Sequence, residues 1–223
     1  MCMENNCVFC SELAGSQKTN FAARYPELCD RVIATTPSLV AFPCLGQLSP
    51  GHFLIIPRFH NCTFRHVQQA VPEVHDEFVY LLNQVHEVLG LDQRGSLIFE
   101  HGARDPEDGG CGIYHAHVHI VPNASLVSHE DAIGFQPAHR ATSLKQVWQG
   151  RTSSSYVLAG SVDTGFSWSD LASPLTSQSL RRNVARSLKV NEWDWRMATR
   201  ETAMFEVLET VRLQKSRAVE ALE

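Results

Sequence analysis

Three histidines alternate with apolar residues in the segment IYHAHVHIVP at residues 113–122. Side chains of a β-strand point to opposite faces with a period of two residues. The spacing therefore predicts a strand whose two faces differ in character. One face carries His115, His117 and His119, and the other carries Ala116, Val118 and Ile120. Such a strand needs a core on its apolar side and presents three imidazoles on its other side.

The chemistry of three neighbouring imidazoles allows several interpretations. An imidazole is a competent nucleophile that titrates near neutral pH, so a histidine flanked by others is suited to attack an electrophilic phosphorus. The same triplet is compatible with the solvated face of an edge strand, or with a metal site made of several histidines. A redox or oxygen-activating metal centre is disfavoured, because no carboxylate lies at ligand spacing on this strand.

Composition and charge narrow the function classes. The chain has 223 residues and a hydrophobic content of 43%, which suggests one domain with a sizeable extension or two small domains. The net charge of −5 argues against a sequence-independent nucleic-acid binder, so a small-molecule substrate is expected. No segment has the length of a membrane span, and the N-terminal residues lack the pattern of a signal peptide. We therefore expect a cytoplasmic protein without a membrane partner.

The seven cysteines do not suggest a disulfide framework, because their number is odd and the expected compartment is reducing. Cys7 and Cys10 have the C-x-x-C spacing that lets two thiolates bind one zinc ion. Histidines would then have to complete the four ligands, and His52 and His60 in the segment PGHFLIIPRFH offer two more imidazoles. Two half-buried thiols or a redox pair are the alternatives for this C-x-x-C.

The first half of the chain predicts an antiparallel sheet crossed by one long helix. Helical spacing of apolar residues extends from Pro72 to Gly90, with a proline suited to a first turn and a glycine suited to a C-terminal cap. Strand patterns precede and follow this helix. They lie at Asp30–Ala34, Ser38–Phe42, His52–Pro57 and Ser96–Glu100, followed by the histidine strand.

The composition of the sequence changes after about residue 128, where Ser and Thr become frequent. We expect a catalytic domain at residues 1–125 and a mostly helical extension at residues 126–223. The extension shows a short strand pattern at 155–159 and helical patterns at 177–190 and 201–222. Its paired residues Arg181 and Arg182, with Trp193 and Trp195, either close over an anionic or planar ligand or form a helix surface and a docking core.

Two segments resemble the signatures of the histidine triad (HIT) superfamily. The segment HAHVHIV at residues 115–121 is similar to the H-φ-H-φ-H-φ-φ signature of this family, and PGHFLIIPRFH is similar to its second signature. With the C-x-x-C the resemblance spans roughly residues 5–122. It implies an α+β HIT-like fold and a homodimer formed through the central helix and a sheet edge, unless the appended region covers that edge.

The resemblance also implies roles for individual residues. His117 matches the nucleophile that takes a nucleoside monophosphate, His119 matches the residue that contacts the phosphoryl oxygens, and His52 matches the histidine that supports them. A histidine at position 119, in place of the glutamine of the transferase branches, points to hydrolysis. A structural zinc is implied at a site formed by Cys7, Cys10, His60 and His115.

The positions that match the substrate-binding residues of the family are Phe42, Cys44, Glu100, Cys111 and Gly112. Cys44 replaces an aspartate, Glu100 replaces an asparagine, and two further positions also depart from the family. The resemblance therefore implies a nucleotide hydrolase or nucleotidyl transferase that acts at the α-phosphate of a nucleotide or nucleotide sugar. The alternative is a zinc-stabilised nucleotide- or phosphate-binding regulatory protein without turnover, which would not need the pair His117 and His119.

Overall fold

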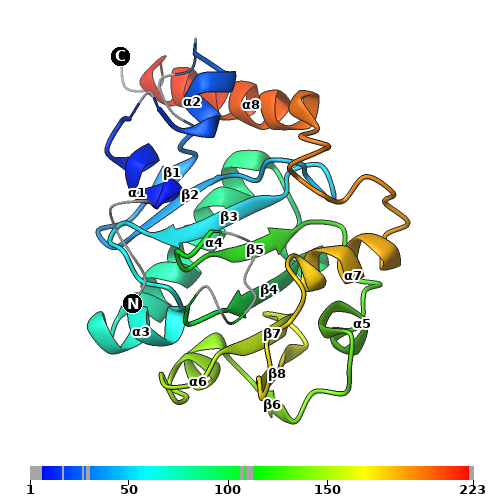
Figure 1. Cartoon of the computed structure of the whole chain (residues 1–223). Helices are drawn as coiled ribbons and strands as arrows, with labels where there is room; N and C mark the ends of the chain where they lie inside the picture. Colours follow the sequence, from blue (N-terminus) through cyan, green and yellow to red (C-terminus); the bar gives the residue numbers. More distant parts are fainter. Residues whose placement is uncertain are drawn as a thin grey trace.

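The computed structural model describes residues 7–16, 18–26, 28, 31–105, 108 and 113–220. Within these residues the strands form one antiparallel sheet in the order β1-β2-β3-β5-β4-β7-β8-β6 (Figure 1). The strands are β1 (Ala34–Thr35), β2 (Leu39–Pro43), β3 (Phe53–Pro57), β4 (Leu97–Gly102), β5 (Val118–Val121), β6 (His139–Ala141), β7 (Tyr156–Ser161) and β8 (Gly165–Asp170). The expected α+β class with an antiparallel sheet is confirmed.

The helices surround this sheet on both faces (Figure 1). They are α1 (Val8–Leu13), α2 (Asn20–Arg24), α3 (Phe64–Ala70), α4 (Val74–Leu89), α5 (His129–Ile133), α6 (Leu144–Trp148), α7 (Ser179–Ser187) and α8 (Glu201–Glu220), with a 3-10 turn η2 (Gln93–Gly95). The long helix α4 lies where apolar spacing predicted it. Gly90 ends it in the left-handed conformation, with a φ of 64°, and donates its N–H to the last turn.

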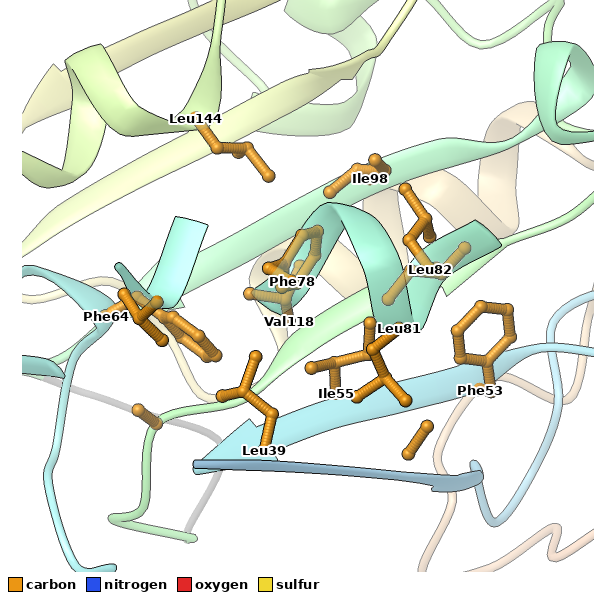
Figure 2. Close-up of a cluster of buried hydrophobic side chains, with 14 of the residues drawn as sticks. Leu39, Phe53, Ile55, Phe64, Phe78, Leu81, Leu82, Ile98, Val118 and Leu144 are labelled. Carbon is orange, nitrogen blue, oxygen red and sulfur yellow. The ribbon is translucent and has the colours of Figure 1, made fainter. Parts of the chain in front are cut away.

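The apolar side of α4 packs across one face of the sheet and forms the main core (Figure 2). Phe78, Leu81 and Leu82 of the helix are at most 1% exposed and lie over Ile55 and Val118 of the sheet. Burying one such side chain contributes about 1.5–3 kcal/mol relative to leaving it in water. This face therefore anchors β3, which lies between His52 and His60 in the sequence, and β5, which contains His119.

The opposite face of the sheet is covered in two separate places. α1 packs over β2 and β3 through Phe9, which is buried with Leu54 and Ile56. α5 and α7 cover β4 and β7 through a second apolar cluster that includes Leu180. A pocket lies between the two covers, since both Phe9 and Leu180 line it together with the histidines.

The region after residue 125 extends the same sheet. β7 pairs along β4 from Gly160 opposite Ile98 to Tyr156 opposite Gly102. The appended region thus covers the edge of β4. This arrangement was the expected alternative to a homodimer formed through a sheet edge. The expected strand at 155–159 and the two expected helices are found, whereas β6 and β8 were not predicted. The sheet is continuous across residue 125, and the division of the chain there stays a prediction.

The first predicted strand is shorter than expected. Only Ala34 and Thr35 pair with β2, whereas the pattern predicted a strand from Asp30, a residue outside those described. The Arg31 side chain binds the Glu12 carboxylate and the Pro43 carbonyl.

Among the described helices, none combines the length and the apolar character that crossing a bilayer requires.

Candidate active site

The three histidines of the triad share one side of the chain, as their spacing predicted. The apolar residues that alternate with them, Ala116, Val118 and Ile120, all belong to the main core on the α4 side. Regular pairing starts only at Val118, so His115 and His117 precede the strand proper. The alternation nevertheless continues through them and places all three imidazoles in the pocket lining.

A chain of hydrogen bonds fixes the tautomers of His52 and His119. The backbone N–H of Leu48 donates to Nδ1 of His52 at 3.2 Å, so this nitrogen carries no proton. In the neutral ring Nε2 must then carry the proton, and it lies 3.0 Å from Nδ1 of His119. His119 accepts this proton at Nδ1, and its own Nε2–H is therefore available as a donor.

Burial keeps this pair of histidines neutral. It is the main cause that lowers the pKa of His52 well below 6.5, and the charge of Arg181 adds to it. Burial also lowers the pKa of His119 well below 6.5, with smaller contributions from His52, His117 and Arg181. The ring of His119 stacks on Phe99 at a centroid distance of 4.5 Å, which fixes its plane. The tautomers derived above thus hold at neutral pH.

His117 is oriented by its own backbone. Its Nδ1 lies 2.7 Å from the carbonyl oxygen of His115, and a carbonyl can only accept, so Nδ1 carries the proton. The Nε2 atom of a neutral His117 then presents a lone pair. The ring of Phe9 lies edge-on to His117 with its centroid at 5.9 Å, so α1 also restricts the imidazole. This is the protonation pattern that a nucleophilic histidine requires.

A second group of residues could hold a metal ion. One atom from each of Cys7, Cys10, His60 and His115 lies within 4.8 Å of the others. The sulfur of Cys7 is 3.3 Å from Nδ1 of His115, and the sulfur of Cys10 is 3.3 Å from Nδ1 of His60. His115 donates from Nε2 to the carbonyl of Pro57 at 2.9 Å, which turns Nδ1 toward the thiols. The four predicted metal ligands are thus brought together.

Residues 26–126 match the HIT domain family. This segment of the chain is therefore similar to a HIT domain.

Similar proteins are found among curated proteins and solved structures. A curated relative, adenylylsulfatase HINT3 of Arabidopsis thaliana, is 29% identical over 121 residues, which are 54% of this chain and 53% of that protein. The chain thus spans about half the length of this relative. A histidine triad protein from Clostridium difficile is 21% identical, with a TM-score of 0.40 over 55% of this chain and 93% of that chain. A HIT family hydrolase from Clostridium thermocellum is 23% identical, with a TM-score of 0.39 over 52% and 90%.

The predicted substrate-binding residues lie in different surroundings. Cys44 lines the pocket beside the histidines. Phe42 lies below the pocket surface, with its ring 5.2 Å from Phe9 and under the guanidinium of Arg31. Cys111 and Gly112 lie outside the described residues.

Glu100 points away from the histidine pocket. Its carboxylate accepts the N–H of Phe64 and the indole N–H of Trp148, both at 3.0 Å, within the core on the α4 side. Burial raises the pKa of this carboxyl group. Its neighbours Phe99 and His101 line the pocket instead. The period of two along β4 could have identified them, because Phe99 pairs with His119 in the sheet register.

Residues that follow the matched segment 26–126 also line the pocket. They are Gln178, Ser179, Leu180 and Arg181 at the start of α7, and Trp195. The sequence offered Arg181 and Trp195 as ligand-binding residues, whereas Arg182 is exposed. Cys62, a further residue of the lining, is disulfide-bonded, whereas the number of cysteines did not suggest a disulfide framework.

Proposed function

We propose that this protein is a nucleotide hydrolase or nucleotidyl transferase that acts at the α-phosphate through a covalent intermediate on His117. The observation that carries the proposal is the protonation pattern of the pocket. His117 offers an Nε2 lone pair because the carbonyl of His115 holds the proton on Nδ1. His119 offers an Nε2–H because His52 occupies its Nδ1. One pocket thus contains a nucleophile and a donor for a phosphoryl oxygen.

The proposed reaction has two displacement steps. Nε2 of His117 forms a bond to the α-phosphorus, the bond from phosphorus to the leaving group breaks, and the leaving group departs with a proton taken from solvent. The Nε2–H of His119 donates to a phosphoryl oxygen as negative charge develops there. Water, or another acceptor in a transferase, then attacks phosphorus from the opposite side. The N–P bond breaks, and His117 is released for the next cycle.

The curated relative supports a reaction of this class. It is named an adenylylsulfatase, which denotes cleavage at a nucleotide phosphate, and it shares 29% identity with about half of this chain. A nucleotide or nucleotide sugar is therefore the proposed substrate. Cys44 and Glu100 differ from the residues that the family has at these positions. The experiment below therefore has to identify the base, the sugar and the leaving group of the substrate. A cytoplasmic location remains part of the proposal.

We propose zinc as the metal of the Cys7 site, in a structural role. Tetrahedral ligands at zinc distances of about 2.0–2.3 Å lie about 3.3–3.8 Å from one another. The sulfur of Cys10 lies 3.3 Å from Nδ1 of His60 and 3.5 Å from Nδ1 of His115, and both distances fall in this range. Two sulfur and two nitrogen donors fill all four positions, which leaves none for substrate. The ion would tie α1 and the end of β3 to the residues that precede His117.

Mass spectrometry of the intact protein after a rapid alkaline quench tests the covalent step, because alkali preserves a histidine phosphoramidate. Wild type and His117→Ala are each mixed with nucleotides, dinucleoside polyphosphates, nucleoside phosphoramidates and nucleotide sugars. We expect the mass of a nucleoside monophosphate on wild type alone, and that mass identifies the nucleotide. Binding of a nucleotide without adduct or product across the panel would favour the regulatory binding protein instead.

A further inference from the structure

Arg181 is a buried cation at the wall of the histidine pocket. It is 4% exposed and lies in the first turn of α7. Its Nε donates to the carbonyl of Trp193 at 2.6 Å, its Nη2 donates to the carbonyl of Gly46, and its Nη1 lies 3.5 Å from the sulfur of Cys44. These partners hold the guanidinium plane in place without neutralising its charge.

The other buried arginines show that this arrangement is unusual for the protein. Among the described residues, Arg31, Arg65 and Arg181 are the arginines that are at most 4% exposed. Arg31 binds Glu12 through two hydrogen bonds, and Arg65 binds Asp170. No described carboxylate lies within ion-pair distance of Arg181. A buried charge without a counter-ion is costly, so a ligand that supplies the anion would relieve this cost.

The nearby acidic residue Asp194 does not fill this role. Its carboxylate accepts from the side-chain amide of Gln178 at 3.1 Å and from the backbone N–H of Arg196 at 3.0 Å. Gln178 precedes α7 in the left-handed conformation, with a φ of 60°, and lines the pocket. Its Oε1 is buried and has no hydrogen-bond partner among the described residues. The start of α7 thus presents to the pocket a cation without an ion pair and an acceptor without a hydrogen-bond partner among the described residues.

Close packing fixes this segment against the matched segment 26–126. A Cβ at Gly46 would lie 2.6 Å from the carbonyl oxygen of Ala198 and 2.9 Å from Cα of Trp195. The N–H of Gly46 also donates to the carbonyl of Thr199 at 2.6 Å. The loop after β2 and the segment after α7 therefore form one wall, and Arg181 is built into it.

We propose that Arg181 forms a second anion-binding subsite of the histidine pocket, so that the substrate carries an anionic group in addition to the phosphate that His117 attacks. This inference rests on the proposed function, because it assumes that a phosphate occupies the triad. The guanidinium suits a phosphate, sulfate or carboxylate oxygen, and Oε1 of Gln178 suits a hydroxyl group beside it. The additional anion belongs either to the sugar or to the leaving group of the substrate.

Calorimetric titration of the full chain tests the subsite without turnover. The probes are the common ribonucleoside 5′-monophosphates, their 3′,5′-bisphosphates and their 5′-diphosphates. We expect a bisphosphate or a diphosphate to bind wild type about 10- to 100-fold more tightly than the matching monophosphate, the range of a charge-assisted hydrogen bond. A preference for the bisphosphate places the anion on the sugar, and a preference for the diphosphate places it on the leaving group.

Two variants assign the effect to Arg181. In Arg181→Gln we expect the preference to disappear, whereas Arg181→Lys should retain part of the preference through its charge. Arg182→Gln, at the exposed neighbouring position, should behave like wild type. A wild type without the preference, or a preference that survives in Arg181→Gln, would overturn the subsite. Either result leaves the covalent labelling of His117 untouched, so the two proposals fail separately.

Discussion

Nε2 of His52 lies 3.0 Å from Nδ1 of His119, and this single contact determines which nitrogen of His119 faces the pocket with a proton. The contact depends in turn on the Leu48 N–H, which donates to the other nitrogen of His52. The loop before β3 thus controls a donor on β5. Because both rings are buried and neutral, the control operates through tautomers and not through charge.

Replacing His52 should therefore slow the formation of the covalent intermediate. His52→Phe keeps a ring but removes the N–H, which frees His119 to place its proton on Nδ1. We expect the single-turnover rate of labelling to fall on the order of 100-fold, the effect of losing one transition-state donor. His52→Gln retains a donor and should recover part of this rate. An unchanged rate in His52→Phe would contradict the tautomer assignment.

The metal site gives a second prediction. We expect purified protein to contain about one zinc per chain, measured by plasma mass spectrometry. Cys10→Ser should lose the metal and lower the midpoint of thermal unfolding, because α1 is then no longer tied to His60 and His115. The matched control is Cys44→Ser, which changes a pocket cysteine outside this site. Equal zinc content in Cys10→Ser and wild type would contradict the ligand set.

The pH dependence of stability should reflect His101. Burial, with the charge of His117 as a smaller cause, lowers its pKa from 6.5 to about 4. Between these values the unfolded chain binds a proton that the folded protein does not, so the free energy of unfolding falls as the pH falls. Below pH 4 this one residue lowers the free energy of unfolding by about 3 kcal/mol relative to its value above pH 6.5.

Urea unfolding between pH 7 and pH 4 measures this effect. His101→Gln should show a shallower loss of stability than wild type across that window. His139→Gln changes an exposed histidine of β6 and should retain the wild-type slope. If both variants lose stability as steeply as wild type, His101 does not contribute to the acid sensitivity.

Two glycines with similar backbone angles provide a test of how the region after residue 125 is docked. Gly46 has a φ of 63° and Gly15 has a φ of 73°, but an added Cβ meets Ala198 and Trp195 only at Gly46. We expect Gly15→Ala to cost about 1 kcal/mol from backbone conformation alone. Gly46→Ala should cost about 3 kcal/mol, because the steric overlap adds to that penalty. Denaturant unfolding measures both, and equal costs would contradict the tight packing of this wall.

The covered edge of β4 predicts the oligomeric state. β7 occupies the hydrogen-bonding positions through which a second copy could extend the sheet, so we expect a monomer. Light scattering after size exclusion should give the mass of one chain, 24.9 kDa. A mass twice as large would support the homodimer that the resemblance implied, formed through a surface other than this edge.

The sequence predicted those parts of the fold that have a clear period. The histidine face, α4 and β7 all follow from residue spacing, and the four metal ligands follow from the resemblance. Glu100 was expected in the pocket because an alignment assigns positions but not the direction of side chains. The residue next to it, His101, lies there because Phe99 stacks on His119 and the strand alternates.

Other parts could not be predicted because their signals are short or distant. β6 has three residues and pairs only with β8, so neither alternation nor length distinguishes it. Arg181 reaches the pocket through contacts with Gly46 and Cys44, which lie far from it in the sequence. An arginine at this position suggested an anionic ligand. Its burial, however, depends on how Trp193–Thr199 packs against the segment at residues 26–126.

The position of Arg181 has a consequence for the order in which the protein becomes competent during synthesis. The proposed nucleophile and the proposed metal ligands all precede β7 and α7 in the chain, so they are synthesised first. A nascent chain could thus assemble a metal-bound half sheet while one wall of its pocket is still missing and the edge of β4 is open. Selective recognition of substrate would begin only after α7 and the segment that follows it have docked, so a partial product of translation would not compete with the finished protein for its ligand.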